Sequence, residues 1–172
     1  MAITTKYLSD ADRQQLVIKE EQNDAIEEIL KNDRKKWNDI ITELLSDTNS
    51  NNYVRLNISK AHDAQINAIS YKQDLNDNIT IMRQKSQKAM SKATVLKADK
   101  ALIYKTGETN FKTGTIAETA IYLDAYLSEV DREIELYTIH MDFLKDTRKN
   151  IENMLYNHAT YATFLQVYGR LE

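Results

Sequence analysis

Apolar residues recur in the last third of the chain at alternating steps of four and three. The series starts at Ile116 and ends at Leu165, and all its positions are apolar or tyrosine except Arg148 and His158. This spacing places side chains on one stripe of a helix, as in coiled coils. The pattern predicts a helix over about residues 115–168 that packs at a low angle against other helices.

The middle of the chain carries a second repeat of this kind, which predicts a helix over about residues 53–105. From Leu75 onwards the four-three alternation is regular, whereas small residues such as Ala68 occupy the stripe before it. The two halves are joined with a slip of one residue. Such a slip indicates a stutter or kink within one helix rather than a domain boundary.

A shorter apolar stripe lies near the N-terminus and predicts a helix over about residues 10–46. It contains Trp37 and is interrupted by Asp33. A polar cluster at 47–52 and the segment 107–114, which begins and ends with glycine, are predicted to be loops. The fold class predicted for residues 1–172 is therefore a single all-α domain, an elongated antiparallel bundle or coiled coil of two long helices plus one shorter N-terminal helix.

Composition excludes several other classes. The 172 residues include no proline, no cysteine and only three glycines, so the turns of a sandwich or barrel cannot be supplied. Disulfides, zinc ribbons and thiol nucleophiles are excluded as well. No glycine-rich phosphate loop is present, and none of the histidines follows a glutamate by three residues as in carboxylate-bridged metal bundles. We therefore expect no enzymatic activity, no metal site and no cofactor.

The charge is distributed unevenly along the chain. Net charge is −3, yet eight of the 23 Lys and Arg residues lie within 79–113 against only Asp99 and Glu108, which gives this segment +6. On a helix, Lys85, Lys88 and Lys92 fall within about 60° of one another. Lysines with interleaved aromatic residues are typical of single-stranded nucleic-acid binding. Complementary pairing with acidic residues of neighbouring helices is the alternative interpretation. The candidate nucleic-acid contacts are Lys88, Lys92, Lys97, Lys100, Tyr104, Lys105 and Lys112.

Long helices in a chain of this size enclose a small core, so we expect self-association into a bundle or ring. Arg148, on the apolar stripe, is predicted to pair with an acid of a neighbouring helix, and His158 to be partly buried. The predicted oligomer contacts are Leu127, Ile134, Tyr137, Arg148, Tyr156 and Phe164.

The C-terminal helix resembles that of the UvsY family, the recombination mediators of T4-type phages. The resemblance covers about residues 97–160 and includes the stretch 100–107, which matches the family's basic, tyrosine-containing end of the preceding helix. It implies a ring-forming, non-enzymatic protein that binds single-stranded DNA and helps to load a RecA-like recombinase. The residues that carry it in the last helix are Val130, Asp131, Ile134, Glu135, Tyr137, Ile139, Asp142, Phe143, Ile151 and Tyr156.

The expected function is therefore single-stranded DNA binding as a recombination mediator or accessory factor. A structural assembly protein of a phage neck, tail or connector, without a nucleic-acid role, is the alternative. A helical bundle acting at membranes is a more distant one, because the apolar stripes leave little surplus apolar surface. We expect DNA, further copies of the chain and a RecA-like recombinase as partners, no membrane, and a cytoplasmic location in the host cell.

Overall fold

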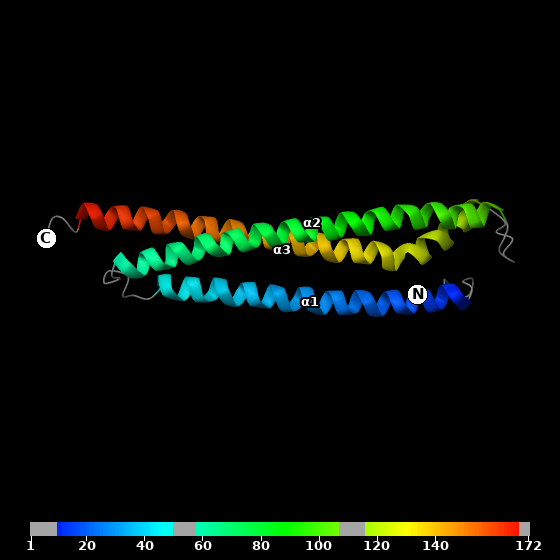
Figure 1. Ribbon diagram of the computed structural model, residues 1–172, viewed down its shortest axis with the longest axis horizontal. Coiled ribbons are helices and arrows are strands. Elements are labelled where there is room, and N and C mark those ends of the chain that lie inside the picture. The colour runs from blue at the N-terminus through cyan, green and yellow to red at the C-terminus, as the bar shows by residue number, and fades with distance from the viewer. Residues whose placement is uncertain (1–9, 50–57, 107–115, 169–172) are drawn as a thin grey trace. The chain divides into compact units, whose positions relative to one another are not determined.

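The structure is a computed structural model that describes three α-helices (Figure 1). These are α1 (Asp10–Asn49), α2 (Ile58–Thr106) and α3 (Ile116–Tyr168), with no strand in those ranges. Side chains are described mainly within 14–44, 65–99 and 127–157. The predicted all-α class and the order of one shorter and two longer helices are confirmed. The predicted loop at 47–52 begins too early, because α1 continues to Asn49.

The chain divides into two compact units, and each helix contributes one segment to each of them. Unit 1 consists of Met1–Leu30 with Arg83–Ile139, and unit 2 of Lys31–Met82 with His140–Glu172. Each unit therefore combines parts of α1, α2 and α3 that are distant in the sequence.

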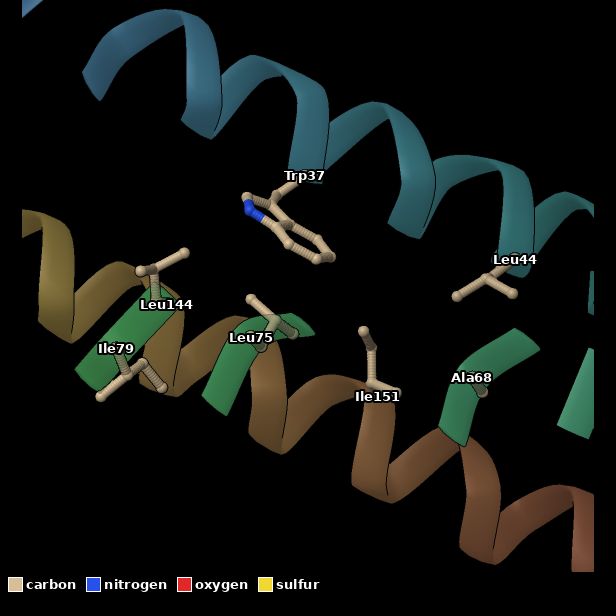
Figure 2. Packing of buried hydrophobic residues seen from close by; sticks show 7 residues of the cluster. All are labelled: Trp37, Leu44, Ala68, Leu75, Ile79, Leu144 and Ile151. Carbon is tan, nitrogen blue, oxygen red and sulfur yellow. The ribbon is translucent and has the colours of Figure 1, made fainter. Parts of the chain in front are cut away.

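The core of unit 2 is apolar and is built by all three helices. Figure 2 shows Trp37 and Leu44 of α1 pointing toward the side chains of α2 and α3. The Trp37 ring meets Tyr71 of α2 edge-on, with 6.3 Å between centroids, a favoured geometry for two aromatic rings. Three positions of α2 that pack in this core, Tyr71, Leu75 and Ile79, are four residues apart, which is the slip seen in the sequence pattern.

Unit 2 also contains a buried polar side chain, His140, that contacts a partly exposed carboxylate. The imidazole of His140 is fully buried, and its Nε2 lies 3.0 Å from Oδ2 of Asp33. Asp33 is the residue that interrupts the apolar stripe of α1. This polar position of α1 therefore lies opposite a polar residue of α3, His140. His140 itself was not singled out from the sequence. The side chain of His158, the histidine predicted to be partly buried, lies outside the described residues.

Within the part of the chain that the structure describes, Arg148 contacts α2 through a hydrogen bond and not through the predicted ion pair. Its Nη1 donates a hydrogen bond of 3.1 Å to Oδ1 of Asn76, so among the described residues its partner on α2 is an amide and not an acid. The carboxylate of Glu152, on its own helix, lies 3.9 Å from Nε. Lys72 of α2 reaches the same carboxylate at 3.0 Å. The two α2–α3 contacts run in opposite directions along the helices, which confirms antiparallel packing of these segments.

The core of unit 1 is smaller and is centred on Leu127, which is 1% exposed. Leu16 of α1, Leu96 of α2 and Val130 of α3 pack against it. Leu127 is therefore buried within its own chain, and Tyr137 is buried as well. Their predicted role as oligomer contacts stays a prediction.

Burial raises the pKa of Tyr137 above its ordinary value near 10, and the nearby Glu133 carboxylate raises it further. Below pH 10 the phenol is neutral in both folded and unfolded chains, so its contribution to stability is fully present. Above pH 10 the unfolded chain ionises first, and stability falls as pH approaches the raised folded-state pKa. We expect Tyr137→Phe to remove the part of the alkaline loss of stability that ionisation of this phenol causes. Thermal unfolding of both proteins at pH 8 and pH 11 measures it, and an equal alkaline loss in the two proteins would contradict the assignment.

Candidate nucleic-acid interface

The lysine row, defined as Lys85, Lys88 and Lys92, lies on the part of α2 that belongs to unit 1. Ser86, Ala89 and Ala93 point inward from the same helix and are buried. Each lysine of the row immediately precedes one of these residues in the sequence and is therefore rotated away from the core by about 100°. The row is exposed along its whole length.

Ion pairing distinguishes the row from the rest of the basic segment. Within the described residues, Lys85, Lys88 and Lys92 form no ion pair. Nζ of Lys97, in contrast, lies 3.3 Å from Oδ1 of Asp131 on α3. For Lys97, the alternative interpretation of pairing with an acidic residue of a neighbouring helix is therefore correct. Its side chain is still 48% exposed, and an exposed ion pair of this kind contributes little to stability.

Four of the candidate contacts have no described side chain. Lys100, Tyr104 and Lys105 lie on the last turns of α2, where only the backbone is described. Lys112 lies outside the described residues. Of the seven candidates, the structure thus places Lys88 and Lys92 together on one exposed face, with Lys85 completing the row.

Two acidic residues of α1 in unit 1, Asp24 and Glu27, are bound by α3. Nη2 of Arg132 donates hydrogen bonds to Asp24 at 2.7 Å and to Glu27 at 2.8 Å. The hydrogen bonds from Arg132 to Glu27 and then to Asp24 hold the pKa of its guanidinium above the ordinary value. Lys19 of α1 in turn pairs with Glu133 of α3. None of these pairs involves a lysine of the row.

Asn23 adds a buried polar contact to the same α1–α3 boundary. Its Nδ2 donates to the backbone oxygen of Glu129 at 2.6 Å and to Oε2 of that residue at 3.0 Å. Sequence reasoning missed both Asn23 and Arg132. Asn23 could have been found from the sequence, because it is a polar residue at a position of the apolar stripe of α1, three residues before Ile26.

A cavity of about 210 Å³ opens beside the lysine row, between the three helices of unit 1. Its apolar lining comes from Leu16, Ala89, Leu96 and Val130, so each helix supplies part of it. The polar residues that line it are Gln15, Lys19, Lys92 and Glu133. Lys92 thus belongs both to the exposed row and to the wall of an apolar cavity.

The remaining predicted oligomer contacts differ in accessibility. Ile134 is half-buried and lines a groove of about 570 Å³ between α2 and α3, together with Met90 and Ile139. Tyr156 is 74% exposed. Phe164 has no described side chain. Ile134 and Tyr156 therefore stay predictions for a subunit contact.

The described residues contain no group of three or more His, Cys, Asp or Glu side chains that could hold a metal ion. None of the helices, over the residues described, is long and apolar enough to cross a membrane. Comparison with protein-family models, curated proteins and solved structures gives no match to this chain. The geometry of the site is therefore the basis of the functional proposal.

Proposed function

We propose that this chain binds single-stranded DNA, without catalysis, through the lysine row of α2. The observation that carries the proposal is that three lysines share one exposed helix face and form no ion pair within the described residues. Uncompensated ammonium groups attract polyanions, and phosphate binding releases condensed counterions from the nucleic acid. Asp24 and Glu27, two acidic residues of the same unit, are held by Arg132 and not by the row.

Replacing the row with alanine (Lys85→Ala, Lys88→Ala and Lys92→Ala together) tests this proposal. We expect affinity for an oligonucleotide of about 12 nucleotides to fall about tenfold or more at low salt. Each phosphate contact contributes about −0.7 to the slope of log affinity against log salt for single strands, so the slope should flatten by about 2. Fluorescence anisotropy over a salt series measures both quantities.

The matched control removes the same charge elsewhere. Lys31, Lys35 and Lys149 are exposed residues of unit 2, and their joint replacement by alanine changes the net charge by the same amount. We expect this control to keep most of the affinity and the salt slope of the original protein. Equal loss in the two triple variants would show that overall charge, and not the row, governs binding. If the protein without substitutions does not bind oligonucleotides even at low salt, the result would favour the alternative function as a structural assembly protein.

We further propose that DNA binding serves recombination, as the resemblance of residues 97–160 to the UvsY family implies. Under this proposal the chain self-associates on the strand and assists a RecA-like recombinase. Native mass measurement with and without a short single strand tests the self-association. A mass equal to one chain under both conditions would contradict it.

A further inference from the structure

We infer that the cavity beside Lys92 accepts one pyrimidine base of the bound strand. This inference rests on the proposed function and extends it from phosphate binding to the recognition of an unpaired base. Lys92 lines the cavity and also belongs to the lysine row. A phosphate held by Lys92 brings its own nucleotide to the cavity, because base and phosphate of one nucleotide are joined through a single sugar.

The size of the cavity suits one six-membered ring. An engineered apolar cavity of about 150 Å³ in another protein is large enough to bind benzene. The cavity in unit 1 measures about 210 Å³. It therefore has room for a ring of that size with the exocyclic atoms of thymine or cytosine.

The residues that line the cavity are also suited to a nucleic-acid base. Leu16, Ala89 and Val130 provide apolar surface for the ring faces. Lys19 and Glu133, which pair with each other, place a donor and an acceptor at the same cavity. Pockets for unstacked bases combine these two features, apolar contact with the ring and polar contact with its edge.

This arrangement also gives a physical reason for single-strand preference. A base within a duplex is stacked and paired, and its removal costs a few kcal/mol. An unpaired base enters the cavity without most of that cost. The lysine row contacts only phosphates, which single-stranded and double-stranded DNA both present. The cavity is therefore the element that distinguishes single-stranded from double-stranded DNA.

The test compares two strands with identical phosphates, an oligothymidylate of about 12 nucleotides and a strand of the same length that carries stable abasic sugars throughout. We expect the original protein to bind the abasic strand about tenfold more weakly. Ala89→Leu fills the cavity from α2, and we expect it to weaken binding of the oligothymidylate to the level of the abasic strand. Affinity for the abasic strand should not change, because the lysine row is intact.

Two further variants keep the result interpretable. Thr94→Leu adds apolar bulk to an exposed position of α2 that does not line this cavity, and it should leave the tenfold difference unchanged. Val130→Leu fills the cavity from α3 by one methylene, so it serves if thermal unfolding shows that Ala89→Leu does not fold. Equal affinity of the original protein for the two strands would overturn the inference and leave the proposed function standing. Failure to bind either strand would overturn the proposed function itself.

Discussion

Leu75→Ala is expected to lower the free energy of unfolding by about 2–5 kcal/mol. The Leu75 side chain is fully buried in the core of unit 2, where Trp37, Leu144 and Ile151 belong to the same cluster. Truncation removes the transfer free energy of the lost atoms and leaves a cavity that long helices cannot easily close. Because domains are stable by only about 5–15 kcal/mol, this change is a large fraction of the total. Denaturant unfolding followed by circular dichroism measures it.

Ile69→Ala is the matched control for this truncation. Ile69 lies on the same helix and in the same unit, is 56% exposed, and loses the same number of carbon atoms on substitution. Alanine also has a higher helix propensity, so we expect a change within about 0.5–1 kcal/mol. Similar losses at positions 69 and 75 would contradict the assignment of Leu75 to the core.

Single replacement of either Asp33 or His140 by leucine is expected to cost about 1–3 kcal/mol. His140→Leu leaves the Asp33 carboxylate, which is 31% exposed, beside an apolar core without its imidazole partner. Asp33→Leu leaves the imidazole, which is fully buried, without that carboxylate. The double variant leaves neither group unmatched and continues the apolar stripe across the core. It should therefore cost less than the two single changes together, by about 0.5–3 kcal/mol.

A double-mutant cycle by denaturant unfolding measures this coupling. Thr138→Leu with Asp33→Leu provides a comparison, because Thr138 is an exposed α3 residue assigned to the other unit. Losses that simply add for Asp33 and His140 would show that the 3.0 Å contact contributes nothing specific to folding. A polar contact of this kind also penalises shifted registers of α1 against α3, since a shift would separate the buried imidazole from its carboxylate partner.

The proposed interface depends on the balance between paired and unpaired charge in unit 1. Arg132 and Lys19 are engaged by carboxylates, and Lys97 is paired with Asp131. Among the described residues, the lysine row takes no part in these ion pairs. This arrangement supports polyanion binding by α2 because a phosphate backbone need not break an existing ion pair in order to bind.

The existence and approximate lengths of the three helices could be predicted from the sequence. Periodicity at steps of four and three is a local property of the chain, and no proline interrupts it. The concentration of lysines in 79–113 was visible for the same reason. Helix ends were predicted less accurately, as the continuation of α1 to Asn49 shows, because side chains that favour caps and turns are also tolerated on a terminal helical turn.

The helical architecture, the apolar stripes and the position of the positive charge follow from the amino-acid sequence, since each depends only on neighbours along the chain. Three features depend on packing between helices: among the described residues Lys97 has an ion-pair partner while Lys92 has none, Asp33 faces His140, and a cavity opens beside Lys92. Asp33 and His140 are 107 residues apart, and Lys97 and Asp131 are 34 apart. Contacts over such separations depend on which helix faces are brought together by packing, and this information is absent from the periodicity of any single helix.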